Sequence, residues 1–420
     1  MSRPFFSIAI PCKNRPDRMR NAIRSVLEQT FGDLEVIVCD NSDEAAVAET
    51  AAAAAAFDDP RVRYVRTNGR LSMPDNWEHA VRDTRGEFVG ILTDRSVLRR
   101  DALQTAHDVA ARTGSHLVCW FPDRFGGDAA GREFRRRKST LREYTLDTAE
   151  VLHYFLSGHP KSATKMVPKL MSAVCHHSVL DAIRASALGR VCLPVAPDFT
   201  SGFLMLAHTP RMVLLDDGLF VSCGRGNGSA FRHRGELAQR FLADLGMTWR
   251  DVVGLAPTEA CFTHALTLND FLRLKQALPE VFAPYEPDRR QYYAGCLTDY
   301  VRAARGGAEL SDDYDLLLAG LALEDDDVQA FVRTRQVYLD ATTVLPGGAG
   351  DPEPGPDGAA EPGALAAAGS GFDSVFDALA WAESHPRVPS GGSPVEMPSL
   401  ESLKPWNARR LGAAVTESLS

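Results

Sequence analysis

The sequence predicts an α/β protein with a mostly parallel sheet flanked by helices, followed by a helical C-terminal region. Short apolar runs recur through the first 120 residues, and each is followed by a stretch with helical spacing. Strands that alternate with helices form βαβ units, whose right-handed crossovers make neighbouring strands parallel. From residue 235 to about 345 helical patterns dominate, which predicts the C-terminal helical region.

Each expected element has its own signal. Residues 5–10 form a short apolar run, long enough for a buried strand. Pro16 then opens the next helix, at a position where its missing N–H costs nothing. The other expected strands are residues 34–39, 61–66, 87–92, 116–121, 189–195 and 212–223, and the helices between the first of them are residues 45–57, 74–85 and 101–112. The arginine-rich stretch 126–142 is either a solvated loop or helix face, or a basic lip that attracts anions to a cleft.

The chain of 420 residues is long enough for two or three folding units. Its clearest boundary is residues 346–371, because half of these 26 residues are Gly or Pro and such a composition cannot support a packed core. We therefore expect an α/β domain at residues 1–230, a helical region at 231–345, a flexible linker at 346–371, and a tail at 372–420 that is partly docked or disordered.

Charge, hydropathy and cysteine usage exclude several classes of protein. The formal net charge is −9, so nucleic acid is not an expected partner. No run approaches 18 apolar residues, so no membrane-spanning helix is expected, and the first residues predict a strand rather than a signal peptide. The eight cysteines form no CxxC pair and are expected to be reduced thiols in a cytoplasmic protein. Peripheral docking at a membrane through the basic stretch 132–142 stays open.

Candidate binding loops follow three of the expected strands. Ligands of open α/β sheets bind at the carboxyl ends of the strands, and polar residues follow the strand ends at 11–15, 40–43 and 93–96. No GxGxxG follows the first strand, and the chain has neither GxxxxGK[ST] nor GxSxG. A nicotinamide-dependent dehydrogenase, a P-loop NTPase and an α/β-hydrolase are therefore not expected.

Residues 7–44 resemble the opening of the inverting family 2 glycosyltransferases, which have the GT-A fold. The stretch SIAIPCKNRPDRMRNAIRSVLEQTFGDLEVIVCDNSDE has the first strand, Pro-x-x-Asn-Arg, the Ser-Val-Leu-x-Gln-Thr helix and the acidic turn of that family at matching spacing. Asn76-Trp77, the Gly-Glu-Phe at 86–88 and the strand that ends in Asp94 are similar to an Asn-Trp/Pro-Asp subgroup, as is the later GRVCLPVAPDFTSGFLML. The resemblance covers roughly residues 5–230.

The resemblance implies a nucleotide site at the ends of the first two strands. It places Pro11, Asn14, Arg15, Asp40 and Asn41 at the nucleotide, with the Asp40 carboxylate accepting a hydrogen bond from the base. The implied donor is a UDP-, dTDP- or GDP-linked sugar. The implied acceptor is a hydroxyl group of a glycan, a lipid-linked sugar or a natural product, and a homodimer is compatible with the sequence.

The resemblance also implies a divalent metal, Mg²⁺ or Mn²⁺, held against the donor diphosphate by Asp94, with Arg95, Ser96 and His233 as further donor contacts. The family usually has two or three acidic residues where this chain has Thr93-Asp94-Arg95-Ser96. Three alternatives stay open. Asp94 holds the metal with water and phosphate, or Arg95 replaces part of its charge so that metal is only weakly required, or the chain is a non-catalytic relative.

Asp198 matches the catalytic base of the family, which would take the proton from the attacking acceptor hydroxyl. The sequence-based hypothesis is therefore an inverting, nucleotide-sugar-dependent glycosyltransferase. The alternative is a nucleotide-sugar-binding or scaffold protein on the same fold, and donor hydrolysis discriminates between the two.

Overall fold

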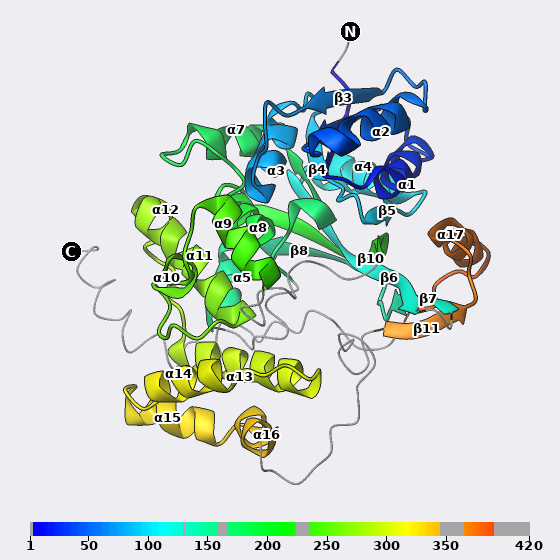
Figure 1. The fold of residues 1–420 in the computed structure, drawn as a ribbon. Coiled ribbons are helices and arrows are strands. Elements are labelled where there is room, and N and C mark those ends of the chain that lie inside the picture. The colour runs from blue at the N-terminus through cyan, green and yellow to red at the C-terminus, as the bar shows by residue number, and fades with distance from the viewer. Residues whose placement is uncertain (1–2, 129–130, 158–165, 224–235, 345–364, 390–420) are drawn as a thin grey trace.

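The computed structural model describes residues 3–128, 131–157, 166–223, 236–344 and 365–389 (Figure 1). Its sheet has the strand order β11-β7-β6-β9-β4-β1-β2-β3, and β10 pairs with β5, β6 and β8. Helices cover both faces, and a group of helices continues below the sheet in the view of Figure 1. The α/β class with a helical C-terminal region is confirmed.

The N-terminal elements are β1 (Phe6–Cys12), α1 (Pro16–Leu27), β2 (Leu34–Asp40), α2 (Glu44–Ala55), β3 (Val62–Arg66), α3 (Met73–Arg82), β4 (Phe88–Ile91), β5 (Ser96–Leu98) and α4 (Ala102–Thr113). β1 lies between β2 and β4, and β3 follows β2, all in parallel. The expected parallel βαβ units are therefore present, and the carboxyl ends of β1, β2 and β4 meet at one edge.

The burial of β1 explains why its sequence is mostly apolar, with the one polar residue, Ser7, buried and donating to the Glu35 carboxylate at 2.6 Å. Phe6, Ile8 and Ile10 pack into the core under α1 and α4, whereas Ala9 faces the core on the other side of the sheet. A strand covered on both faces has no solvent side, so it needs no alternation of polar residues. In α1, the buried Met19, Ala22, Ile23 and Val26 have the spacing of one helix face.

The middle elements are β6 (Leu117–Asp128), β7 (Gly131–Arg137), β8 (Glu143–Asp147), α5 (Thr148–Ser157), the 3₁₀ turn η1 (Leu170–Ser172), β9 (Ala173–His176), α7 (His177–Ala185), α8 (Pro197–Ala207) and β10 (Arg211–Cys223). β10 is parallel to β6 but antiparallel to β5 and β8. β7 and β9 are also antiparallel to their neighbours, so the sheet is parallel around β1 and mixed beyond it.

Two sequence-based assignments in the middle of the chain are wrong. The stretch 126–142 is neither a loop nor a helix, because most of it belongs to the antiparallel hairpin of β6 and β7. Residues 189–195 are not a strand, because the Glu78 carboxylate accepts from the backbone N–H groups of Val191 and Cys192 at 2.8 Å. Those donors are therefore not available to a sheet ladder.

The helical region follows as α9 (Glu236–Leu245), α10 (Trp249–Val253), α11 (Thr263–Ala277), α12 (Pro279–Phe282), α13 (Arg289–Arg305), α14 (Ser311–Leu321), α15 (Asp326–Arg333) and α16 (Gln336–Val344). It shares a core with the sheet domain, where the Phe203 ring of α8 meets the Phe271 ring of α11 edge-on at 5.5 Å. All eight cysteines are free thiols. Among the helices of the described residues, none combines the length and the apolar character needed to cross a membrane.

The chain then returns to the sheet domain in β11 (Leu365–Ser370) and α17 (Val375–Ser384). β11 pairs antiparallel with β7, so the last part of the expected linker 346–371 is a strand rather than free chain. The sequence reason is that Gly and Pro crowd residues 346–363, whereas 365–368 is Leu-Ala-Ala-Ala. Residues 345–364 and 390–420 lie outside the described residues.

Candidate functional site

Asp40 is the last residue of β2, and its carboxylate is fully buried. One oxygen, Oδ1, accepts from the backbone N–H of Ser42 at 2.8 Å, which makes a tight Asx turn. The other, Oδ2, accepts from the Tyr64 hydroxyl at 2.7 Å. The carboxylate is therefore held by uncharged partners on the second and third strands. The alternating pattern of 61–66 predicted the strand of Tyr64 but not this contact.

The loop after β1 is fastened to the turn after β2. Asn14 has a positive φ of 56°, a conformation that Asn tolerates better than most residues. Its backbone N–H donates to the Ser42 hydroxyl at 2.8 Å, and its side chain both donates to and accepts from Asp43. Pro11 is buried in β1, opposite Cys39. The structure thus brings these expected nucleotide residues together with Asp40.

Asn41 has a structural task at the same edge. Its buried side-chain amide donates to the carbonyl of Leu71 at 2.8 Å and accepts from the N–H of the same residue at 2.9 Å. It also accepts from the Thr67 hydroxyl at 3.2 Å. This clamp fixes the segment between β3 and α3 beside the Asp40 turn.

Asp94 lies in the loop between β4 and β5, on the other side of β1, and its environment is cationic. Both of its oxygens lie 3.4 Å from the Arg15 Nη1 atom. Burial raises the pKa of the Asp94 carboxyl, while the positive charges of Arg15, Arg95 and Arg18 act in the opposite direction. Burial likewise lowers the pKa of the Arg95 guanidinium.

Ser96 shares a hydrogen bond of 2.9 Å with Thr93, which closes the loop around Asp94. β5 then pairs with β10, where Ser96 lies opposite Ser222 and the Arg95 carbonyl accepts from the N–H of Cys223. The loop is therefore held between two strands, so Asp94 and Arg95 have a fixed backbone. His233, expected near the donor, lies outside the described residues.

A cleft of about 320 Å³ opens beside this loop. Asp94, Arg95 and Ser96 line it together with Arg18 of α1 and with groups from further along the chain: Asn21, Val97, Phe125, Gly126, Arg132, Cys223, Ser374 and Val375. The sequence predicted the first three of these residues. Arg132 belongs to the stretch 126–142, for which a basic lip on a cleft was one of the two expected alternatives. The sequence did not predict the contributions of Arg18 and Ser374, which only the tertiary structure brings together.

Asp198 is in the first turn of α8, directly after Pro197, and is half-buried. Its Oδ2 atom accepts from Lys169 Nζ at 2.7 Å, and the Lys169 ammonium also lies 3.8 Å from the centre of the Phe199 ring. Neither the contact between Asp198 and Lys169 nor the one between Lys169 and Phe199 was predicted. Asp198 is not among the described residues that line the cleft at Asp94.

Asp270 of α11 holds the start of α8 in place. It is buried, and its carboxylate accepts from the backbone N–H groups of Val195 and Ala196 at 2.9–3.1 Å. Burial raises the pKa of Asp270 to about 6, although those two N–H groups favour the charged form. Asp270 therefore links the helical region to the backbone that precedes Asp198, the candidate base.

Residues 7–166 match the family described as Glycosyl transferase family 2. That segment begins in β1 and includes both the Asp40 turn and the Asp94 loop. The chain is also 30% identical over 118 residues to the GalNAc(5)-diNAcBac-PP-undecaprenol beta-1,3-glucosyltransferase of Campylobacter jejuni. This match spans 27% of the present chain and 37% of the relative, so it is confined to little more than a third of that enzyme.

Two solved structures are similar to this chain at low sequence identity. S. aureus TarS is 12% identical with a TM-score of 0.45, over 81% of this chain and 53% of TarS. The mannosyltransferase PcManGT of Pyrobaculum calidifontis, solved with GDP-Man and Mn²⁺, is 18% identical with a TM-score of 0.38, over 82% of this chain and 87% of the other.

Proposed function

We propose that the chain is an inverting glycosyltransferase that moves a sugar from a nucleotide-sugar donor to an acceptor hydroxyl by a single displacement. One observation carries the proposal: the family 2 match over residues 7–166 coincides with the segment that puts two buried carboxylates, Asp40 and Asp94, at one sheet edge on either side of β1. In parallel sheets this edge is where nucleotides bind. The domain boundaries expected from the sequence are proposed together with this function.

The roles divide along the edge. Asp40, with Pro11, Asn14 and Asn41 around it, would receive the nucleoside, because a buried acceptor at a strand end suits the N–H edge of a base. Arg15, also expected at the nucleotide, faces Asp94 and would lie nearer the diphosphate. Arg95 and Ser96 would lie at the donor diphosphate, and His233 remains part of this proposal. The base would come from a UDP-, dTDP- or GDP-linked sugar.

The chain fits a divalent cation, Mg²⁺ or Mn²⁺, only in combination with the donor. In the part of the chain that the structure describes, no three His, Cys, Asp or Glu side chains gather as metal ligands, and Asp94 already faces Arg15. We propose that Asp94 is the protein ligand and that phosphate oxygens supply the rest, because hard cations prefer such oxygens. When bound, the cation neutralises charge on the leaving diphosphate.

Asp198 would take the proton from the acceptor hydroxyl. Lys169 fixes the orientation of its carboxylate through the 2.7 Å contact, and Asp270 fixes the backbone that precedes it. An inverting displacement needs one carboxylate and forms no covalent sugar–enzyme intermediate. The acceptor would be a glycan, a lipid-linked sugar or a natural product, and both peripheral membrane docking and a homodimer are compatible with the proposal.

A ligand panel tests the proposal. Thermal unfolding is measured with UDP, dTDP and GDP, each with and without Mn²⁺, and hydrolysis of the matching sugar donors is followed by release of free sugar. We expect one nucleotide to stabilise the fold by about 2.7 kcal/mol at 100 times its Kd, and Mn²⁺ to add to this effect while binding weakly alone. Stabilisation without hydrolysis or transfer would favour the non-catalytic alternative, and tight Mn²⁺ binding without nucleotide would contradict the role given to Asp94.

A further inference from the structure

Residues 365–387, named here the C-terminal strap, return to the N-terminal domain from more than 100 residues beyond it in the chain. β11 extends the sheet next to β7, and the Gly371 N–H donates to the Arg132 carbonyl at 3.0 Å. α17 then lies beside the sheet domain at the end that carries β5 and α1 (Figure 1). The strap therefore adds both a strand and a helix to this end of the sheet domain.

An apolar cluster holds α17 against the sheet. Val375 and Ala378 are buried against Val97 of β5 and Phe134 of β7. The Trp381 ring meets the Phe134 ring edge-on at 6.5 Å, and the Arg24 guanidinium of α1 lies 4.0 Å from the centre of the Phe376 ring. These contacts bury one face of the helix rather than a single side chain.

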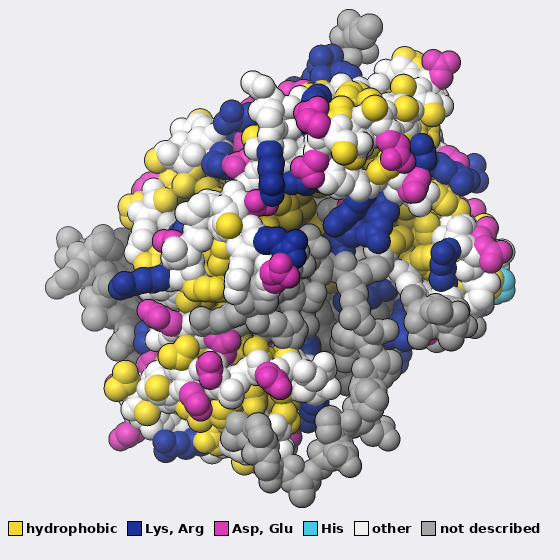
Figure 2. Space-filling view, in the orientation of Figure 1, with side chains coloured by type: hydrophobic (Ala, Val, Ile, Leu, Met, Phe, Trp, Pro, Cys, Tyr) yellow, Lys and Arg dark blue, Asp and Glu magenta, His cyan; other side chains and the backbone are white. Residues whose placement is uncertain are grey.

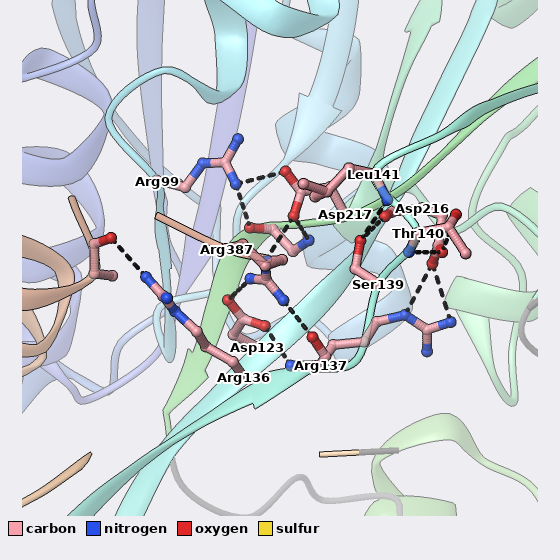
Figure 3. A network of polar contacts seen from close by, with 12 residues as sticks. Arg99, Asp123, Arg136, Arg137, Ser139, Thr140, Leu141, Asp216, Asp217 and Arg387 are labelled. Atoms are coloured by element: carbon pink, nitrogen blue, oxygen red, sulfur yellow. Dashed lines mark hydrogen bonds and ion pairs between the residues drawn. The ribbon is translucent and has the colours of Figure 1, made fainter. Parts of the chain in front are cut away.

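Buried ion pairs fix the far end of the strap (Figure 3). Arg387 lies between Asp123 of β6, at 2.6 Å, and Asp217 of β10, at 3.0 Å. Its side chain is only 10% exposed, and that of Asp123 only 4%. From the other direction, Arg136 of β7 donates to the carbonyls of Ala382 and His385. Charges buried to this extent need their partners, so the docked position is specific.

The N-terminal end of α17 borders the cleft at Asp94. Ser374 and Val375 line it together with Arg18, Arg95 and Arg132, and Arg132 donates to the Asp373 carbonyl of the strap. Ser374 caps the helix in a reciprocal pair with Asp377. The wall of the cleft on this side therefore comes from the strap and not from the family 2 segment.

The charges around the cleft indicate what it binds. Its described lining includes three guanidinium groups and a single carboxylate, Asp94, which also faces Arg15. Basic side chains also gather near the middle of the face in Figure 2. Arginine forks match the oxygens of phosphate groups, and a volume of about 320 Å³ is at the lower end for a small-ligand site.

We propose that the C-terminal strap forms one wall of a pocket for a phosphate or diphosphate group, so that the end of the chain controls anion binding beside Asp94. The proposal deepens the proposed function but does not require sugar transfer. The same chemistry has two sources, the diphosphate of a donor and a phosphate carried by an acceptor, and competition with a nucleoside diphosphate distinguishes them.

A pair of variants at the helix cap tests the strap without undocking it. Asp and Asn are both good N-cap residues that accept from the Asp377 N–H, but the Ser374 hydroxyl also donates to the Asp377 carboxylate, which an Asp at 374 would repel. Ser374→Asp and Ser374→Asn are therefore both made in an Asp377→Asn background, where they differ by one negative charge at the cleft. Pyrophosphate and inorganic phosphate are titrated into the full-length proteins by calorimetry. We expect the protein with Ser374→Asp to bind pyrophosphate about tenfold more weakly than the protein with Ser374→Asn, because the two differ by one negative charge.

A second pair covers the opposite wall. Arg18→Gln should also weaken pyrophosphate binding several-fold, whereas Arg20→Gln, an exposed change on the same helix that is not at the cleft, should not. Repeating the titration with saturating nucleoside diphosphate identifies the source, since loss of binding indicates the donor site and retained binding indicates a separate phosphate group.

Two results would overturn the proposal: a wild-type protein that binds neither anion, or equal affinities for the Ser374→Asp and Ser374→Asn proteins. Nucleotide binding with no effect of Ser374→Asp would reject the strap while leaving the proposed function intact. Pyrophosphate binding that depends on the strap, without any sugar transfer, would support the strap and reject the proposed function.

Discussion

Asp40, at the end of β2, and Asp94, in the loop after β4, lie on either side of β1, yet their surroundings differ in kind. The Asp40 carboxylate is fully buried and accepts from a backbone N–H two residues away and from a tyrosine hydroxyl, whereas the nearby Arg66 guanidinium donates to the backbone carbonyl of Asp40 at 3.1 Å. Asp94 is nearly as buried but faces Arg15, with Arg18 and Arg95 nearby. The Asp40 carboxylate therefore has uncharged partners, whereas the Asp94 carboxylate lies among guanidinium groups.

This difference indicates how one edge of the sheet can bind both ends of one ligand, the base and the diphosphate of a nucleotide. A base presents N–H and carbonyl groups without charge, which a fixed acceptor recognises. A diphosphate presents two or more negative charges, for which guanidinium groups are the suitable partners. The Asp40 turn therefore suits the nucleoside, and the cationic Asp94 loop suits the phosphates. Two of the three predictions that follow, at Asp40 and Arg15, test this division, and the strap variants test the cationic half separately.

The largest effect is expected at Asp198, which belongs to neither half. Asp198→Asn should cut kcat by at least about 10²-fold while leaving donor Kd almost unchanged, because the amide cannot accept the proton of the acceptor. Donor Kd by calorimetry and transfer rate are measured on the same preparation, with Asp108→Asn on the exposed face of α4 as control. Joint loss of donor binding and rate would show that Asp198 supports the donor site instead.

A smaller effect is expected for Asp40→Asn. The amide keeps an oxygen for the Ser42 N–H and can donate to Tyr64, so the turn survives, but a donor now faces the donor of the base. Nucleotide affinity should fall by roughly 1–3 kcal/mol, the cost of an unsatisfied buried group. Binding of the free nucleoside should fall similarly, and pyrophosphate binding should not. Tyr64→Phe, which removes one local partner of Asp40, serves as control. Equal losses for nucleoside and pyrophosphate would erase the distinction between the two loops.

The same contrast explains what the sequence could predict. β1, β2 and α1 follow from apolar runs and helical spacing within a few residues, and the Asp40 turn is equally local. Contacts across long stretches of chain could not be predicted in this way. Glu78 takes the N–H groups of Val191 and Cys192 from 113 and 114 residues away, which prevents the expected strand there.

The hairpin of β6 and β7 was missed for a related reason. Three successive arginines, residues 135–137, hide the alternation expected of a strand. In the fold, Arg136 packs against Trp381 of the strap and Arg137 pairs with Asp216, so both faces of the strand have partners for a charged side chain. The charge pattern therefore makes sense only with the partners in place. The site residues that the family resemblance implied remain proposals, whereas their fixed positions at one edge are a property of the fold.

The smallest effect is expected for Arg15→Gln, measured as stability against pH without ligand. The folded-state pKa of Asp94 is raised by burial, so this group favours the fold at low pH and that contribution is lost as the pH rises through its folded-state pKa. Removing Arg15 raises that pKa further, because a charge that favoured the carboxylate is gone. The variant should therefore match the wild type at acidic pH, where Asp94 is protonated, and become less stable as Asp94 ionises.

The difference in unfolding free energy between the Arg15→Gln variant and the wild type should reach at most about 1 kcal/mol near neutral pH, since the Arg15 and Asp94 side chains are 3.4 Å apart and the Arg15 side chain is 39% exposed. Urea unfolding at a series of pH values measures it, and added salt should shrink it. A difference that stays constant across pH would mean that Arg15 stabilises the loop by packing alone, and the cationic character of this half would then rest on Arg18 and Arg95.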